Sequence, residues 1–272
     1  MKDVPGYQVH AFACSDAGRV RASNEDSFFV ANLSEGVRIE SNGILRFASG
    51  PLGSLFAVAD GMGGAAAGEM ASKLCLRTLY GEVQEQVREV RRPDDGLLEE
   101  ILIEAVGNAN SRIYDLARRN HEYHGMGTTL TTILEIQGRL LIGQVGDSRA
   151  YMLRQDQIRQ LTRDQSLVGQ KVADGDLTEE EARRHPERNI LLQAVGVRPA
   201  VELALRSMAL RPADVLLLCS DGLHSQMSSR EIYEVVADSA GPGEACLALV
   251  DLANERGGPD NITAVLVQFV RE

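Results

Sequence analysis

The 272-residue sequence has no apolar run that approaches the ~20 residues needed for a membrane-spanning helix. Its first residues, MKDVPGYQVHAFA, lack the charged region followed by an apolar region that is typical of a secretory signal. We therefore expect a cytoplasmic protein with no membrane partner.

Basic residues are also too few to favour nucleic-acid binding. The chain carries 28 Lys and Arg against 39 Asp and Glu, which gives a formal net charge of -11. No Lys- or Arg-rich stretch reverses that balance locally. Because binding of nucleic acid depends on neutralising its phosphates, we expect no nucleic-acid partner.

Cysteine is scarce and scattered. The sequence has four, at Cys14, Cys75, Cys219 and Cys246, each among apolar neighbours and none in a C-x-x-C pair. Zinc sites and redox-active disulfides usually need such close pairs. We therefore expect reduced, buried thiols.

The order of sequence patterns indicates how strands and helices alternate. Strands are predicted in YQVHAFACSD, DSFFVANL and GSLFAVAD, with an extended hairpin over residues 34–54 between the last two. Apolar residues at helical spacing predict an antiparallel helix pair over 65–90 and 97–120, with RRPDDG as the break. A β-meander is predicted over 128–162, from TTLTTILEI to QIRQLT.

The second half of the chain also contains strands interrupted by helices. Residues 164–189 are charged and mostly helical by pattern, with a capping-box spacing at Thr178 and Glu181, and look like an excursion from the sheet. Strands VELALRSM and DVLLLCSD follow, then a helix capped by Ser228 and Glu231, a helix over about 242–256, and the strand NITAVLVQFV. Strands in blocks favour an α+β fold: two packed antiparallel sheets in a central sandwich, flanked by antiparallel helix pairs on both faces, as one domain over 1–272.

Acidic residues recur at or just past the ends of the predicted strands. They are Glu25, Asp26, Asp60, Asp221 and Asp260, with Asp147 as a further candidate. Strand ends of a sandwich converge on one rim, where gathered carboxylates repel one another unless a cation lies between them. Oxygen ligands without clustered His or Cys favour a hard ion, Mg²⁺ or Mn²⁺.

Gly61 follows Asp60 directly, so its carbonyl can turn into the same site without a side chain in the way. A carboxylate and a carbonyl from adjacent residues can then hold two ions. Each segment alone also has an ordinary structural explanation, because D-G after a strand is usually a turn and N-E-D is usually a solvated loop. Their joint occurrence in this order favours the metal site.

Eight ordered segments resemble the protein phosphatase 2C family, the metal-dependent serine/threonine phosphatases, in its bacterial form. They run from about residue 15 to 268: RASNEDS, VADGMGG, GTTLTT, VGDSRAY, LTRDQSLV, LLQAVG, LLLCSDGL and DNITAVLV. The resemblance implies the same two-sheet fold. It also implies hydrolysis of phosphoserine and phosphothreonine in phosphoproteins by a metal-activated water at a binuclear Mg²⁺ or Mn²⁺ centre, opposing a bacterial serine/threonine kinase.

The resemblance also implies a role for each site residue. Asp60 would bridge two ions, with the Gly61 carbonyl on one and Asp221 and Asp260 on the other. Glu25 and Asp26 would hold metal-bound water, and Arg21 would pair with the substrate phosphate. Asp147 would join Asp221 at a third, weakly bound ion, although a G-D-S-R turn can equally be structural.

Two further features follow from the same comparison. Residues 164–189 correspond to the family's mobile flap beside the active site. Many eukaryotic members carry a histidine after the D-G pair, often proposed as the general acid, whereas Met62 stands here, so we assign no general acid.

Other catalytic motifs fail on spacing. Cys219 has Ser225, not arginine, six residues later, which excludes a cysteine phosphatase loop, and GMGGAAAGEM lacks the Lys-Ser/Thr of a P-loop. HEYH at 121–124 is one residue short of a zinc-protease helix, so we expect an exposed helix end. His224 can line the substrate cleft, but we interpret it as a loop histidine.

Two alternative functions stay open. One is a catalytically silent, phosphate-sensing regulatory module on the same fold, against which the presence of Asp60, Asp221 and Asp260 argues. The other is a phosphatase for a small phosphate ester or for a single regulator.

Overall fold

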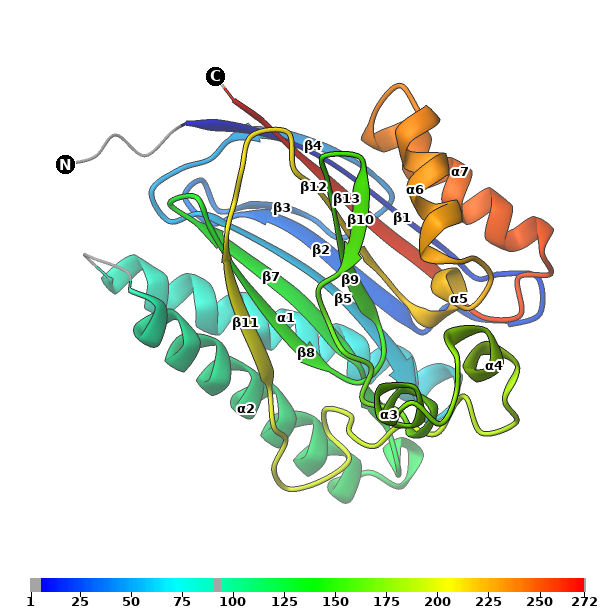
Figure 1. The fold of residues 1–272 in the computed structure, drawn as a ribbon. Helices are drawn as coiled ribbons and strands as arrows, with labels where there is room; N and C mark the ends of the chain where they lie inside the picture. The colour runs from blue at the N-terminus through cyan, green and yellow to red at the C-terminus, as the bar shows by residue number, and fades with distance from the viewer. Residues whose placement is uncertain (1–5, 91–93, 272) are drawn as a thin grey trace.

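The computed structural model describes residues 6–90 and 94–271 and contains two antiparallel β-sheets packed face to face between two layers of helices (Figure 1). In spatial order, the first sheet consists of β10 (Gln157–Gln160), β9 (Arg149–Arg154), β12 (Val215–Cys219), β13 (Ile262–Arg271), β1 (Tyr7–Asp16) and β4 (Gly43–Ala48). The second consists of β11 (Ala204–Ala209), β8 (Arg139–Val145), β7 (Leu130–Ile136), β5 (Ser54–Met62), β2 (Asp26–Asn32) and β3 (Val37–Ile39), with β6 (Gly127–Thr128) paired to β5. We call them the β13 sheet and the β5 sheet. This arrangement confirms the predicted α+β sandwich.

A pair of helices covers the outer face of each sheet (Figure 1). Helices α1 (Ala65–Glu89) and α2 (Asp95–Arg119) lie on the β5 sheet, and α6 (Ser229–Asp238) and α7 (Pro242–Glu255) lie on the β13 sheet. Shorter helices are η1 (His121–Tyr123), α3 (Leu167–Asp174), α4 (Glu179–Arg184) and α5 (Asp221–His224). The predicted capping boxes are present at the starts of α4 and α6.

The strands are apolar on both sides because each sheet is covered on both faces. In β2, Phe28 and Val30 point into the core between the sheets, whereas Phe29 and Ala31 point towards α1 and α2. This alternation is the two-residue period of a strand. All four cysteines are free and buried, as predicted.

The hairpin predicted over residues 34–54 is wrong in its pairing. Strand β3 pairs with β2 in the β5 sheet, whereas β4 pairs with β1 in the β13 sheet. The two strands therefore extend the edges of different sheets. A polar segment between two strands does not reveal this, because each edge offers its own row of unpaired backbone groups.

The meander predicted over residues 128–162 is also wrong as one continuous unit. Strands β7 and β8 pair in the β5 sheet, and β9 and β10 pair in the β13 sheet. The chain crosses between the sheets at the turn formed by Gly146, Asp147 and Ser148. This crossing places Asp147 at the rim that both sheets share.

Smaller differences concern the ends of elements. Strand β5 continues two residues past Asp60, because Gly61 and Met62 pair with β6. Helix α2 begins at Asp95, where Asp94 caps it by accepting a hydrogen bond from the amide of Leu97. The predicted break, RRPDDG, lies partly outside the described residues. His121 and His124 are exposed at a short helix, as expected.

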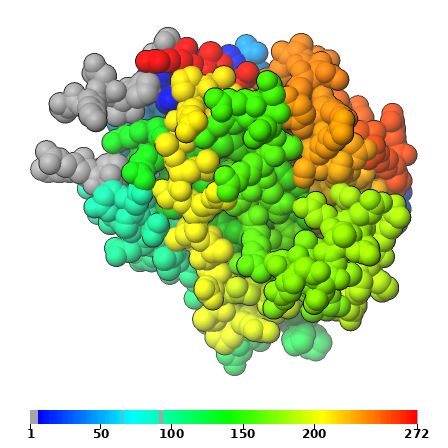
Figure 2. Space-filling model, viewed as in Figure 1, coloured from blue at the N-terminus to red at the C-terminus, as the bar shows by residue number. Residues whose placement is uncertain are grey.

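The segment 164–189 leaves the β13 sheet after β10 and returns to the sandwich before β11. It holds α3 and α4 and stands out from the surface in yellow-green below the orange helix α6 (Figure 2). Near its start, Ser166 pairs through the backbone with Leu191, which lies two residues past its end. None of the helices in the described part of the chain is both long and apolar enough to cross a membrane.

Candidate active site

A cavity of about 220 Å³ lies at the ends of the central strands. Its lining includes every predicted site residue except Asp26: Arg21, Glu25, Asp60, Gly61, Asp147, Asp221 and Asp260. A larger groove of about 1040 Å³ shares four of these residues and runs along the segment 164–189 and α5. The structure therefore brings together carboxylates that are far apart in the sequence.

Strand register explains why the carboxylates meet. Asp26 at the start of β2 lies directly opposite Asp60 near the end of β5. Strands β12 and β13 are antiparallel neighbours, so Asp221 just after β12 lies beside Asp260 just before β13. Because opposed residues in an antiparallel pair have their Cβ atoms ~5 Å apart, acidic residues at these strand ends gather without any further device.

Asp26 lies behind the cavity and is only 7% exposed. One of its oxygens, Oδ2, accepts hydrogen bonds from Ser220 Oγ at 2.7 Å and Thr263 Oγ1 at 2.6 Å. Its other oxygen, Oδ1, is buried without a hydrogen-bond partner among the described residues. Burial, with the charges of Asp221 and Asp260, raises the pKa of Asp26 to about 7 despite these two hydrogen bonds.

The other carboxylates experience the same mutual repulsion. Burial raises the pKa of Asp221 to about 6, and the charge of Asp260 adds to the effect. Burial and the neighbouring carboxylates raise the pKa of Asp60 and of Asp147 well above their ordinary values, and burial raises that of Glu25. The repulsion expected from the sequence is thus present, and a bound cation would relieve it.

Two glycines allow α1 to approach the cavity wall. A Cβ on Gly61 would lie 2.2 Å from the carbonyl oxygen of Gly68 in α1. A Cβ on Gly68 would lie 1.9 Å from Glu25 Oε2. The side chain of Glu25 therefore occupies space that exists only because both positions lack side chains.

Arg21 lies at the mouth of the cavity and is about half exposed. Its Nη2 donates to Asp260 Oδ2 at 2.7 Å. The other oxygen of Asp260 accepts a hydrogen bond from the amide of Asn261 at 2.9 Å. Arg21 is the only one of the predicted site residues that brings a positive charge to the cavity.

Three neutral residues that sequence reasoning missed support the carboxylates. Ser220 and Thr263 hold Asp26, and Asn261 binds the loop that carries Arg21 and Glu25. The Asn261 side chain donates to the carbonyl oxygens of Ala17 and Ser23 and accepts from the amide of Glu25 at 2.8 Å. Ser220 and Asn261 directly adjoin predicted acidic residues, and that adjacency is the signal that could have found them.

His224 is not the loop histidine that we expected. It is the last residue of α5, is 6% exposed, and has its Nε2 3.0 Å from the carbonyl oxygen of Asp147. The S-D-G sequence after a strand is usually a turn, whereas here it begins a one-turn helix. A Cβ on Gly222 would lie 2.0 Å from the carbonyl oxygen of Asn261, so only glycine allows this close approach.

The donor atoms fit hard divalent cations. Both Asp26 Oδ1 and Asp221 Oδ1 are buried and lack hydrogen-bond partners in the described chain, which is costly for a carboxylate unless another group compensates it. In residues 6–90 and 94–271 no three Asp, Glu, His or Cys side chains already form a complete ligand set. The fit therefore rests on charge and oxygen chemistry rather than on a preformed cage.

Comparison with known proteins identifies the family. A family model described as protein phosphatase 2C matches residues 45–252. The chain belongs to the protein phosphatase 2C family. It is 35% identical over 260 residues to a serine/threonine phosphatase stp of Listeria innocua, covering 96% of each chain. It is 38% identical over 258 residues to the serine/threonine protein phosphatase PstP of Mycobacterium tuberculosis, covering 95% of this chain and 44% of that longer protein.

Solved structures agree with this membership. The structure of the catalytic domain of PstP in complex with two manganese ions is 36% identical, with a TM-score of 0.77 over 97% of this chain and 99% of that one. The structure of the S. agalactiae serine/threonine phosphatase is 31% identical, with a TM-score of 0.82 over 97% of this chain and all of that one. The recognised family and its fold are thus confirmed.

Proposed function

We propose that this chain is a metal-dependent protein phosphatase that hydrolyses phosphoserine and phosphothreonine in phosphoproteins. The observation that carries the proposal is the cavity of about 220 Å³ at which the carboxylates of this family member converge, with buried oxygens that have no hydrogen-bond partner among the described residues. The relatives named serine/threonine phosphatase, one of them solved with two manganese ions, support it. Its cellular role would be to oppose a serine/threonine kinase and act on that kinase's substrates.

In this proposal Asp60 would contact two Mn²⁺ or Mg²⁺ ions, the Gly61 carbonyl one of them, and Asp221 and Asp260 the other. When bound, the cations would supply Lewis acidity for activating water and would offset the charge of the phosphoryl oxygens. Glu25 and Asp26 would hold metal-bound water by accepting its hydrogen bonds. Asp147 and Asp221 would hold a third ion more weakly.

The chain's own residues bind and orient the phosphate ester. Arg21, whose guanidinium is about half exposed at the cavity mouth, binds the phosphoryl oxygens, for which its planar fork of donors is well suited. Met62 lines the cavity but has no proton to give the leaving group. We therefore assign no general acid.

We further propose that residues 1–272 act as one phosphatase domain in which the segment 164–189 is a flap over the larger groove. This groove of about 1040 Å³ is lined from both the flap segment and α5. A peptide that carries the phosphorylated residue would lie there, next to the cavity.

The test is to assay the purified full chain on a phosphothreonine peptide and on p-nitrophenyl phosphate, with Mn²⁺ and with chelator. We expect turnover of the peptide that requires Mn²⁺, and a fall in kcat/KM of about a hundredfold or more for Asp60→Asn, because the bridging carboxylate is lost. Asp156→Asn is the matched control, since Asp156 lies on the exposed turn between β9 and β10.

Three results would contradict the proposal in different ways. Turnover in chelator, or an Asp60→Asn variant as active as the wild type, would refute the mechanism. Activity on the small ester and on no phosphopeptide would favour a small-molecule phosphatase. Binding of Mn²⁺ without any turnover would favour a silent regulatory module.

A further inference from the structure

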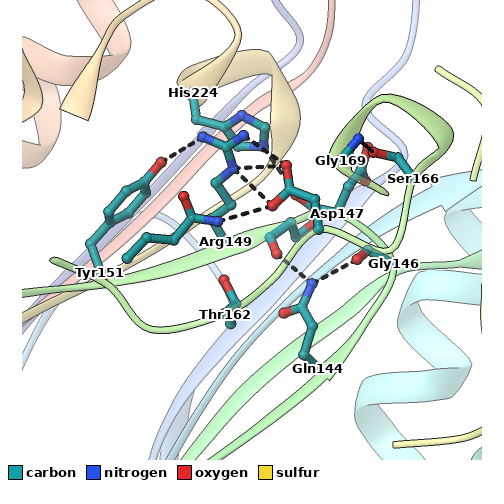
Figure 3. Close-up of polar contacts among 12 residues, drawn as sticks. Gln144, Gly146, Asp147, Arg149, Tyr151, Thr162, Ser166, Gly169 and His224 are labelled. Carbon is teal, nitrogen blue, oxygen red and sulfur yellow. Dashed lines mark hydrogen bonds and ion pairs between the residues drawn. The ribbon is translucent and has the colours of Figure 1, made fainter. Parts of the chain in front are cut away.

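The turn that carries Asp147 is held by a network of hydrogen bonds (Figure 3). Gln144 Nε2 donates to the carbonyl oxygens of Gly146 at 2.9 Å and Ser148 at 2.7 Å. Gly146 also exchanges two hydrogen bonds with Gln165, its amide donating to Gln165 Oε1 and its carbonyl accepting from the Gln165 amide. The first and third carbonyl groups of the turn are thus held by residues of the β5 sheet and of the flap segment.

The carbonyl of Asp147, in the middle of the turn, is held differently. The partner that the structure gives it is His224 Nε2, at 3.0 Å. Because a carbonyl oxygen only accepts, Nε2 must carry the proton, and the neutral ring therefore has its hydrogen on Nε2. Burial, with the nearby positive charge of Arg149, lowers the pKa of His224 to about 3, so the ring stays neutral throughout the physiological range.

His224 is connected to the metal cavity by a short and rigid path. It ends α5, the one-turn helix that Asp221 begins, so three peptide units separate the two residues. The helix lies close against the loop before β13, because a Cβ on Gly222 would lie 2.0 Å from the carbonyl oxygen of Asn261. The hydrogen bond from His224 therefore ties the Asp147 carbonyl to the helix that carries Asp221.

Arg149 fixes the other side of the same turn. Its guanidinium binds Asp164 through Nε at 3.0 Å and Nη2 at 2.7 Å and donates from Nη1 to the hydroxyl of Tyr151 at 3.0 Å. Figure 3 shows the ring of His224 next to this guanidinium. Since Arg149 already has these partners, it does not compete with the cavity for the carboxylate of Asp147.

We propose that His224 is a positioning residue for the Asp147–Asp221 pair and thereby sets the affinity of the third, weakly bound divalent ion. The inference rests on the proposed function only for the existence of that ion site. His224 lines the larger groove but is not proposed as a ligand of the ion. It acts by holding the Asp147 carbonyl. Residues that hydrogen-bond to metal ligands orient those ligands in this way, and removing such a residue typically weakens metal binding 10- to 100-fold.

The test measures Mn²⁺ binding to the full chain by isothermal titration and by the paramagnetic resonance of free Mn²⁺. His224→Leu removes the donor at similar volume, and we expect the weakest Mn²⁺ site to lose affinity by about tenfold or more while the tighter sites change less than about twofold. His224→Gln places an amide N–H near the position of Nε2 and should restore the weakest site to within about threefold. His10→Leu, the same change in the half-buried middle of β1, is the control.

A double-mutant cycle separates positioning from a general loss of packing. In Asp147→Asn the weakest site is already impaired, so adding His224→Leu should cause little further loss if His224 acts through Asp147. Equal weakening of all sites, failure of His224→Gln to restore the weakest one, or additive losses in the cycle would overturn the inference. A Mn²⁺-binding protein with these patterns but no phosphatase activity would refute the proposed function and leave this inference standing.

Discussion

Replacing Asp26 by Asn should stabilise the metal-free protein at neutral pH, although Asp26 is a proposed functional residue. The pKa of this carboxyl is raised from its ordinary value of 3.8 to about 7, chiefly by burial. Below pH 3.8 the group is protonated in both the folded and the unfolded protein and costs nothing. As pH rises towards 7, the unfolded chain gives up its proton and the folded protein does not, so the free energy of unfolding falls.

The size of the effect follows from the two pKa values. At 1.36 kcal/mol per pKa unit, the loss is ~2 kcal/mol at pH 5 and at most ~4 kcal/mol at pH 8. In the variant, the Asn oxygen can still accept from Ser220 and Thr263, whose donor atoms lie 2.7 Å and 2.6 Å from Oδ2. Since 1 kcal/mol shifts the Tm of a chain of this size by roughly 2–4 °C, even half of that maximum should raise the Tm of the Asn variant by at least ~4 °C at pH 8.

The assay is thermal unfolding of the wild type and Asp26→Asn in chelator at pH 5 and pH 8, then with saturating Mn²⁺ at pH 8. The stabilisation should be smaller at pH 5 than at pH 8. It should shrink when Mn²⁺ is added, because cations offset the carboxylate charge in the wild type. A variant that is less stable than the wild type at pH 8 in chelator, or equally stabilised at both pH values, would refute the reasoning.

Two further substitutions separate the site from the scaffold. Gly68→Ala places a Cβ 1.9 Å from the present position of Glu25 Oε2, so the carboxylate must move. We expect a Tm within ~3 °C of the wild type but about tenfold more Mn²⁺ needed for half-maximal activity. An unchanged Mn²⁺ requirement would contradict this. Asp214 is fully buried and binds Arg154 at 2.6 Å. Asp214→Ala should therefore lower the free energy of unfolding by ~3 kcal/mol and the Tm by about 6 °C or more, while kcat/KM at 25 °C stays within about twofold. A Tm near that of the wild type would show that the ion pair contributes nothing to stability.

The elements themselves were largely predictable, because they depend on local patterns. The period of apolar residues placed α1 and α7 within one residue of their observed ends, and the capping boxes at Thr178 and Ser228 were identified from residues three apart. The pairing of strands was less predictable. The sequence pattern predicted that β3 and β4 form one hairpin, whereas they lie in different sheets. The pattern cannot distinguish the two arrangements, because either sheet edge satisfies the same backbone groups.

The site shows the same division between local and long-range information. Acidic residues at strand ends are visible in the sequence, and their convergence follows once the sheets are antiparallel and the strand ends share a rim. The neutral partners are harder to identify. Ser220 and Thr263, which hydrogen-bond to Asp26, lie 194 and 237 positions from it in the sequence. A serine or threonine near a strand end also has many ordinary roles, so neither residue stands out.

The sequence by itself therefore predicted the candidate site residues: the carboxylates, Arg21 and Gly61. Only the tertiary structure decided that Asp147 lies where the chain crosses between the sheets, and that His224 holds its carbonyl from α5. The physical reason is range. Periodicity and capping act over a few residues, whereas a hydrogen bond between residues 77 positions apart exists only after two packed sheets have brought them together.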